Sequence, residues 1–243
     1  LYHFTKSYIK FHIKNRHKIR KEDRERHLLA KQLALPELFD ALTQIEINGD
    51  TFLLYLLKIF QLNTRICRVF HYNSEQILKI VPILVSSLHK KNDKIVKLSL
   101  ISIYNIMKDG RKKAYYALSQ FNDEILNYIF QNYYNFSFNV QEEIIYVFIE
   151  YTYYLNADQL LHFFEEYNLI HILTEILYFD CFYLREDLFL GFLNIYDTFQ
   201  KRGLIFLQHL NNEEFVDAVE SMDPSCSTHF AEFYEKLMQL LTH

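Results

Sequence analysis

The sequence predicts an all-α protein: a right-handed α-solenoid of about five helical repeats with a basic N-terminal helix. Three observations support this prediction. Only four Gly and three Pro occur among 243 residues, too few for the tight turns of a sheet-rich fold. Apolar residues recur at three- and four-residue steps, as in a helix that buries one face. The same layout of helices returns about every 45 residues, which indicates stacked repeats.

Four segments share this layout, in which an apolar helix is followed by a short polar corner and a second apolar helix. They begin, in steps of 45, 44 and 46 residues, at Leu33, Leu78, Asn122 and Asn168. A fifth and looser copy runs from Gly203 to Leu241, and Pro224 interrupts it. In the second copy, the second helix carries apolar residues on two sides, which is typical of a helix between neighbouring repeats.

The corners between these helices carry residues that begin or end helices. Short polar side chains that can cap a helix stand at Asn92-Asp93, Asn122-Asp123 and Asn156-Ala157-Asp158. Pro36 and Pro82 occupy equivalent positions 46 residues apart. We expect both near the start of the first long helix, because a first-turn N–H has no intrahelical partner. Three glycines are predicted in corners, where a positive φ is useful: Gly49, Gly110 and Gly203.

Charge is sorted along the chain, although the net charge is only −4. Residues 1–32 carry ten Lys and Arg against three acids, whereas residues 33–243 carry 16 bases against 27 acids. Residues 114–184 contain no Lys or Arg and hold 21 of the 41 Phe and Tyr residues. These differences predict a basic helical arm over residues 1–32 and an acidic, aromatic repeat domain over residues 33–243.

The sequence contains no recognised motif for catalysis or for a cofactor. No P-loop, GxGxxG, HExxH or GxSxG pattern occurs, and the eleven His show no obvious metal-ligand pair. Adjacent acids such as Glu165 and Glu166 point to different sides of a helix and do not form an acid–base pair. The aromatic-rich window lacks the interleaved Lys and Arg of a nucleic-acid reader. We therefore expect no enzyme, no cofactor, no metal site and no nucleic-acid reader.

Cysteine content and hydropathy bear on the compartment. The three cysteines, Cys67, Cys181 and Cys226, are odd in number and widely spaced, which fits a reducing compartment better than a disulfide framework. No run of eighteen apolar residues occurs, and the basic N-terminal region leads into more charge instead of an apolar signal segment. We expect a cytoplasmic or nuclear location and no transmembrane segment.

With these features the sequence resembles the armadillo repeat family, and importin-α within it. Gln159–Ile170, followed by HILTEIL, resembles a short first helix that runs into a second one. Val96–Asp109 resembles the third helix that lines the concave groove, and Val140–Glu143 and Leu184–Asp187 open the same helix in later copies. In the arm, Ile19–Leu33 resembles the end of an importin-β-binding segment. The resemblance implies an armadillo/HEAT-like solenoid.

The resemblance also implies binding residues on the third helix of each repeat. In that family an Asn there hydrogen-bonds the backbone of an extended peptide, and a Trp one turn earlier packs against its side chains. Asn105 and Asn194 match the Asn, whereas the chain contains no Trp. Gln61 and Glu150 stand at equivalent positions of other copies. The residues predicted to bind a peptide are Gln61, Asn105, Glu142, Glu143, Tyr146, Glu150 and Asn194.

Two functions are consistent with these features. The first is an importin-α-like adaptor in protein transport or nuclear import, which binds basic or extended peptide segments on an acidic, aromatic concave face. Its arm would bind an importin-β-like partner through Lys14, Arg16, Lys18, Arg20, Lys21, Arg24 and Arg26. The alternative is a structural scaffold subunit of a larger assembly, whose arm docks on an acidic protein, RNA or an anionic membrane surface. The abundance of Phe and Tyr favours permanent burial against a partner in that case.

Overall fold

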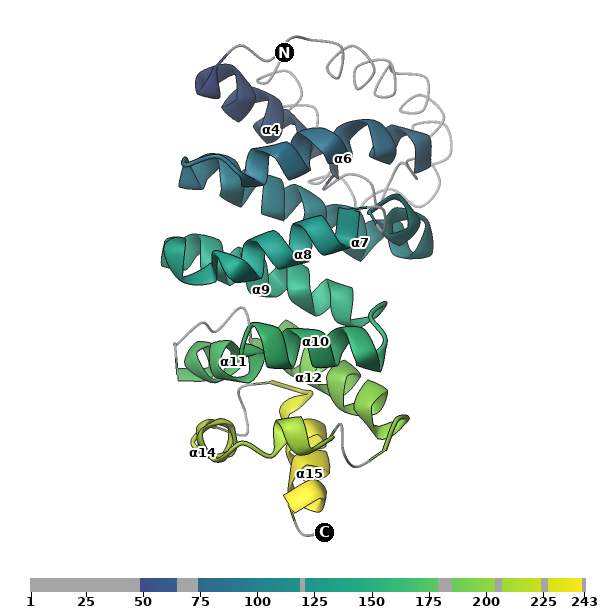
Figure 1. The fold of residues 1–243 in the computed structure, drawn as a ribbon, viewed down its shortest axis with the longest axis vertical. Coiled ribbons are helices and arrows are strands. Elements are labelled where there is room, and N and C mark those ends of the chain that lie inside the picture. Colours follow the sequence, from purple (N-terminus) through teal and green to yellow (C-terminus); the bar gives the residue numbers. More distant parts are fainter. Residues whose placement is uncertain are drawn as a thin grey trace, which may run out of the picture. The chain divides into compact units, whose positions relative to one another are not determined.

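The computed structural model describes residues 49–64, 74–118, 121–178, 185–203, 207–223 and 227–241. Within these residues every regular element is helical, and short corners join the helices (Figure 1). The all-α prediction is therefore confirmed. The predicted basic arm over residues 1–32, with its seven named Lys and Arg, lies outside the described residues, as does the predicted boundary at residue 33.

The chain divides into two compact units, Leu1–Ile144 and Ile145–His243, which we call the N-terminal and C-terminal units. The described part of the N-terminal unit contains α4 (Asp50–Thr64), α6 (Ser74–Leu88), α7 (Asp93–Leu118), α8 (Asn122–Gln131), the 3-10 turn η3 (Tyr133–Asn135) and the start of α9 (Phe138–Thr152). The C-terminal unit contains the end of α9, α10 (Ala157–Glu166), α11 (Leu169–Tyr178), α12 (Arg185–Gln200), η4 (Gln208–Leu210), α14 (Glu213–Glu220) and α15 (Phe230–Leu241).

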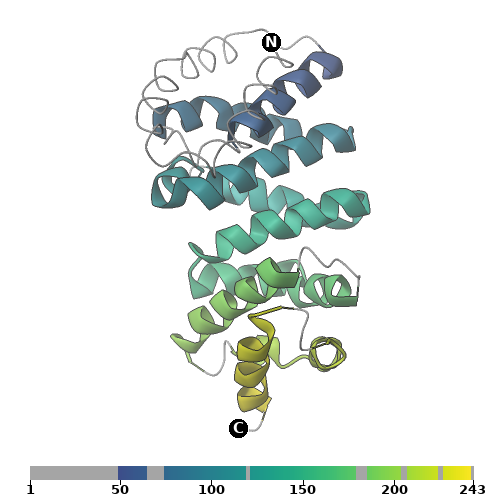
Figure 2. The ribbon, with the colours of Figure 1, turned by 180° about the vertical axis from the view of Figure 1, so that it is seen from behind.

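Each unit has two layers of helices. In the N-terminal unit α6 and α8 face the viewer in Figure 1, and α4 and α7 face the viewer in Figure 2. In the C-terminal unit α10 and α11 face the viewer in Figure 1, and α12 and α15 in Figure 2. The helices α7, α9, α12 and α15 begin 45, 47 and 45 residues apart. The predicted repeat is thus present as stacked helical units.

The short first helix that the sequence of Gln159–Ile170 predicts is also present. α10 is followed by α11 after a two-residue corner that contains Asn168. Asn168 has a φ of 49°, in the left-handed region that Asn tolerates better than most residues. This conformation turns the chain sharply, so that α10 and α11 can pack against each other.

Several predicted corner residues are confirmed. Gly49 and Gly203 stand outside helices with φ of 86° and 108°. Asn156 caps α10: its side chain accepts a 3.0 Å hydrogen bond from the Gln159 N–H, and the Gln159 side chain accepts one from the Asn156 N–H. The Asn92 side chain accepts a hydrogen bond from the N–H of Lys94 at the start of α7.

Three corner predictions are wrong. Pro82 lies inside α6, because this helix begins at Ser74 and not near the proline. The helix tolerates Pro82 because the proline is on an exposed face, where water can bond the carbonyl that lacks its helical donor. Gly110 lies inside α7, which continues to Leu118. Asn122 is the first residue of α8 and not its N-cap, which is Phe121.

The two units bury different side chains. Among the described residues, the buried aromatics of the N-terminal unit are Phe60, Phe130 and Tyr133. Those of the C-terminal unit are Phe148, Tyr151, Phe163, Phe164, Phe189, Phe192, Tyr196, Phe199, Phe215, Phe230 and Phe233. Rings from α12, α14 and α15 meet in one cluster, in which Phe192 lies 5.3 Å from Phe215 and 5.1 Å from Phe233 between ring centroids. The aromatic excess of the sequence is therefore largely core in this unit.

None of the helices in the described residues combines the length and apolarity needed to cross a membrane. The His, Cys, Asp and Glu side chains of the same residues form no group of three that could hold a metal ion.

Candidate peptide-binding surface

Three helices each leave one stripe of side chains partly or fully exposed between buried neighbours. The α7 stripe consists of Lys97, Leu98, Ile101, Asn105 and Lys108. The α9 stripe consists of Glu142, Glu143, Tyr146 and Glu150 of α9, together with Tyr153 in the turn that follows the helix. The α12 stripe consists of Glu186, Asp187, Leu190, Asn194 and Asp197. Steps of one, three, four and three residues place each set on one helix face, and the sets correspond at 45 and 44 residues.

The predicted peptide-binding residues lie on these stripes. Asn105 is on the α7 stripe and Asn194 is on the α12 stripe. The α9 stripe holds the other four, Glu142, Glu143, Tyr146 and Glu150. Gln61 is partly exposed on α4. All seven residues are thus accessible to a ligand, and their role in binding one stays a prediction. The sequence reasoning missed Tyr153, Asp187 and Leu190, which the repeat offset alone could have indicated.

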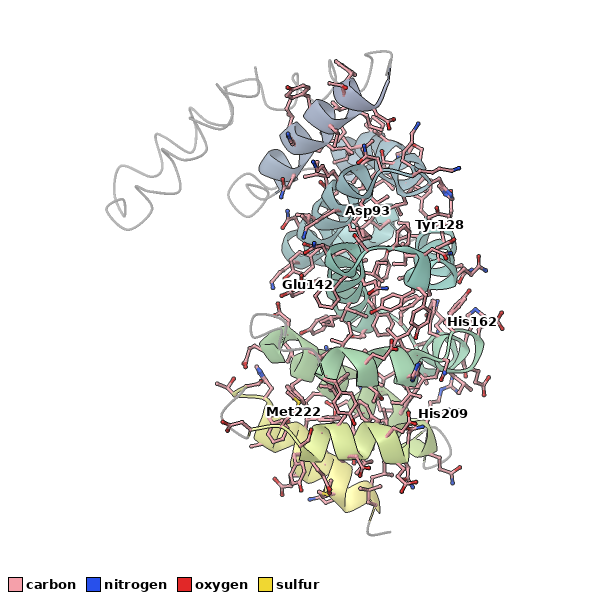
Figure 3. The ribbon with its side chains drawn as sticks, turned by 90° about the vertical axis from the view of Figure 1, so that its left-hand side faces the viewer. Asp93, Tyr128, Glu142, His162, His209 and Met222 are labelled. Atoms are coloured by element: carbon pink, nitrogen blue, oxygen red, sulfur yellow. The ribbon has the colours of Figure 1, made fainter. Side chains whose placement is uncertain are left out.

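The α7 and α9 stripes meet through an ion pair in the N-terminal unit. The Lys97 ammonium lies 3.2 Å from a carboxylate oxygen of Glu143, so the starts of the two helices are neighbours. Burial raises the pKa of Glu143, and the nearby charge of Lys97 only partly opposes this effect. Glu143 is therefore less available to a ligand than the sequence suggested. Glu142 has no ion-pair partner among the described residues, and Figure 3 shows it on the opposite side of this unit from Tyr128 of α8.

The α9 and α12 helices approach closely in the C-terminal unit. Gly191 makes this possible: a Cβ atom there would lie 3.1 Å from a side-chain carbon of Ile149. Near this contact, the Asn194 amide donates a long, 3.5 Å hydrogen bond to the hydroxyl of Thr152. A backbone carbonyl of a ligand could replace this weak bond, as the predicted role of Asn194 requires.

Two acids of the α12 stripe are bound to α15 and the residues before it. The Glu186 carboxylate accepts hydrogen bonds from the Ser227 hydroxyl at 2.6 Å and the Thr228 N–H at 2.8 Å, and from the Thr228 hydroxyl. These bonds, with the nearby charge of His229, lower the pKa of Glu186 to about 2. The Lys236 ammonium lies 2.8 Å from Asp197. Both acids join neighbouring repeats. Because their charges already have partners, the α12 stripe offers less negative charge to a ligand than its sequence indicates.

No protein-family model matches the sequence, and no curated protein matches it. Solved structures do match. A designed armadillo repeat protein in complex with the peptide (KR)4 has a TM-score of 0.60 and 16% identity over 85% of this chain and 81% of that chain. An engineered protein has a TM-score of 0.61 and 12% identity over 98% and 96%. A computationally designed armadillo repeat protein for modular peptide recognition has a TM-score of 0.57 and 16% identity over 86% and 81%.

At these identities the likeness shows the fold. The chain has an all-α, armadillo-like solenoid fold, as its 45-residue period predicted. Nothing in the comparisons points to importin-α within the armadillo-like proteins.

Proposed function

We propose that the chain is a non-enzymatic protein-interaction module that binds extended basic segments across the α9 and α12 stripes. The α9 stripe carries this proposal, because besides the paired Glu143 it presents Glu142, Glu150 and two Tyr in a window that lacks Lys and Arg. The carboxylates attract Lys and Arg side chains of a ligand. The Tyr rings supply contact area and cation–π contacts of about 0.5–2 kcal/mol each.

The repeat geometry favours an extended ligand. Packed helices lie about 8–10 Å apart, which corresponds to about three residues of an extended chain. A peptide that crosses α9 and then α12 would therefore present a side chain to each stripe about every third residue. Asn194 stands where it can bond the peptide backbone between these side chains. The complex of a designed armadillo repeat protein of similar fold with the peptide (KR)4 supports a basic peptide as the ligand.

The finer proposal is an importin-α-like adaptor of the cytoplasm or nucleus, whose basic arm binds an importin-β-like partner. It is supported by the sequence of the arm, in which Ile19–Leu33 resembles the end of an importin-β-binding segment. Affinity purification from native extract, with and without residues 1–32, tests it. Loss of an importin-β-like protein from the shorter bait is expected, and recovery of the same partners by both baits would contradict the role of the arm.

Peptide binding can be tested by fluorescence anisotropy with a labelled peptide of alternating Lys and Arg. The variant is Glu142→Gln with Glu150→Gln, which removes two charges of the α9 stripe. We expect about a tenfold loss of affinity, because exposed ion pairs contribute about 0.2–1 kcal/mol each and cation attraction adds to them. Affinity of the wild-type chain should also fall steeply with salt.

The matched control is Glu213→Gln with Glu214→Gln, two exposed acids of α14 that lie outside the stripes. It removes the same net charge and should change the affinity by less than about twofold. Equal losses in both variants would show general attraction to an acidic protein. Equal binding of an uncharged scrambled peptide would refute the proposed function.

The scaffold function has its own supporting observation. Tyr134 is 60% exposed and Phe138 is 41% exposed at the corner between η3 and α9, and Tyr178 at the end of α11 is 63% exposed. Large exposed rings of this kind are typical of surfaces that a partner covers. Size-exclusion chromatography separates the two functions: a soluble monomer favours the peptide-binding module, and aggregation without partners favours the scaffold subunit.

A further inference from the structure

The corner between α6 and the first turn of α7 carries three positive charges. Its residues, 89–94, read His-Lys-Lys-Asn-Asp-Lys, so that three lysines stand against one acid, Asp93. Lys90, Lys91 and Lys94 are all exposed, and none of their ammonium groups has an ion pair or a hydrogen bond within the part of the chain that the structure describes. We call residues 89–94 the basic corner. Its three lysine charges are available to a ligand.

The corner one repeat later, between α8 and α9, carries aromatic rings and amides instead. Residues 131–141 include no charged residue, and we call them the aromatic corner. Two of its rings are largely open to solvent, since Tyr134 is 60% exposed and Phe138 is 41% exposed. The exposed amides of this corner are those of Gln131, Asn135 and Asn139. The aromatic corner thus offers flat ring faces beside hydrogen-bonding groups.

Contacting rings join the two corners. Between ring centroids, His89 of the basic corner lies 3.9 Å from Tyr128 of α8. The Tyr128 ring in turn lies 6.4 Å from the ring of Phe136 in the aromatic corner. Both corners lie at the left edge of the N-terminal unit in Figure 1 and at its right edge in Figure 2. Lys90 and Tyr134, which are 44 residues apart in the chain, therefore belong to one edge of this unit.

This edge offers the three interactions that a single-stranded nucleic acid uses. Lysines bind phosphates, exposed rings stack on bases, and side-chain amides bond base edges. Each nucleotide brings both a phosphate and a flat base, whereas an acidic protein segment carries its charge and its apolar surface on separate side chains. An anionic membrane would have to bury the amides of Gln131, Asn135 and Asn139 beside the rings, at a cost in lost hydration. A duplex keeps its bases stacked in its interior and cannot cover the rings.

We propose that the basic corner and the aromatic corner together bind a single-stranded nucleic acid. Its phosphates pair with Lys90, Lys91 and Lys94, and its bases stack on Tyr134 and Phe138. The sequence alone argued against a nucleic-acid reader, because the aromatic-rich window lacks Lys and Arg. The fold supplies the lysines from the preceding repeat. This inference does not rest on the proposed function, which uses the α9 and α12 stripes and a basic ligand.

The test is fluorescence anisotropy of the full chain with a labelled uridine 12-mer. The variant Tyr134→Ala with Phe138→Ala should bind the 12-mer at least about tenfold more weakly, because the loss of one base–ring stack weakens binding by about tenfold. The matched control is Tyr55→Ala with Tyr178→Ala, two exposed tyrosines outside this edge, and it should change the affinity by less than about twofold. A duplex of the same length should bind the wild type and the ring variant equally.

A second variant, Lys90→Gln with Lys91→Gln, tests the phosphate contacts. The slope of log affinity against log salt concentration should flatten by about 1.4, since each phosphate contact to a single strand contributes about 0.7. Its control, Lys79→Gln with Lys201→Gln, removes the same charge from α6 and from the corner after α12, and it should leave the slope unchanged. Far-UV circular dichroism shows whether each variant is folded, and the lysine variant decides the test if the ring variant is not.

Wild-type affinity for the 12-mer in both edge variants would overturn the proposal, because another basic region, such as residues 1–32, would then hold the strand. Equal losses in the variants and in their controls would also overturn it. The edge would belong to a membrane or to an acidic segment instead if the chain bound phosphatidylserine vesicles or a Glu-rich peptide, but not the 12-mer, and only the ring variant lost that binding.

Discussion

The N-terminal and C-terminal units use the same helical repeat with opposite chemistry. Among the described residues, the N-terminal unit buries three aromatic rings and the C-terminal unit buries eleven. The α7 stripe carries two lysines, whereas the corresponding α12 stripe carries three acids and no base. The apolar spacing that defines the repeat is common to both units. Repeat geometry therefore depends on where apolar residues stand, and leaves their size and the surface charge free to vary.

The difference in core composition also changes how each core is specified. Aliphatic side chains of the N-terminal unit, such as Leu84 and Leu100, fill space without strong preferences in orientation. The rings of the C-terminal unit meet edge to face, for example Phe189 and Phe230 at 5.0 Å and 87°. We expect the C-terminal unit to tolerate core changes less well.

The largest expected effect is in the ring cluster. Phe192→Ala should lower the free energy of unfolding by about 3–5 kcal/mol, because its ring contacts Phe215 and Phe233 and the cavity would be lined by rigid rings. Ile103→Val, in the aliphatic core, should cost only about 0.5–1.5 kcal/mol. Urea unfolding followed by circular dichroism measures both. Similar losses in the two variants would show that the cores do not differ in this way.

A smaller effect is expected where α9 and α12 approach. Gly191→Leu should lower the free energy of unfolding by about 1–3 kcal/mol, because the added side chain overpacks the contact with Ile149. Gly191→Ala should be close to neutral, since a gain of about 1 kcal/mol in helix propensity offsets a tight Cβ contact. Thermal unfolding of both variants checks the difference. A Leu variant as stable as the wild type would mean that the helices can move apart freely.

The smallest effect concerns two acids that the repeat relates, Glu186 and Glu142. Glu186→Gln should lower the free energy of unfolding by about 1 kcal/mol at neutral pH, because the Glu186 carboxylate accepts hydrogen bonds from Ser227 and Thr228. This value is reduced because the carboxylate is partly exposed to solvent. Glu142→Gln should be neutral, since Glu142 has no ion-pair partner among the described residues. Chemical unfolding at pH 7 measures both. Equal stability of the Glu186 variant and the wild type would contradict the bridging role.

The pH dependence of this effect follows from the pKa of Glu186. Its pKa falls from the ordinary 4.5 to about 2 in the folded protein, so its stabilisation is present above about pH 4.5 and is lost as the pH falls toward 2. The difference in free energy of unfolding between wild type and Glu186→Gln should therefore shrink as the pH falls over that interval. A difference that stays constant from about pH 5 to about pH 2.5 would assign the effect to packing instead of charge.

Local signals in the sequence predicted much of the fold. The 45-residue period, the Asn156 capping box and the left-handed glycines Gly49 and Gly203 depend on residues close together in the chain. Pro82 did not mark a helix start, because burial of the opposite face of α6, with Val81, Leu84 and Val85, outweighs a single unfavourable residue. Gly110 did not mark a helix end, since α7 continues through it to Leu118. Tertiary packing decided the position of Pro82, and packing is not visible in a local pattern.

The candidate surface was less predictable. The repeat offset placed Asn105, Glu150 and Asn194 on exposed stripes, because equivalent positions share a helix face. The pairing of Glu143 with Lys97 was missed, since it joins helices one repeat apart and does not follow from either segment alone.

The bridges between repeats bear on how the chain folds. Arg202 contacts Asp158 at 2.6 Å, His209 contacts Glu165 at 4.0 Å, and Lys97 contacts Glu143 at 3.2 Å. The partners of these three bridges are 44, 44 and 46 residues apart in the chain, which is about one repeat. Each bridge then needs the closure of a loop no longer than about one repeat, so structure can begin in any pair of neighbouring repeats and spread by adding the next. The chain should accordingly have low contact order for its length and fray from its ends.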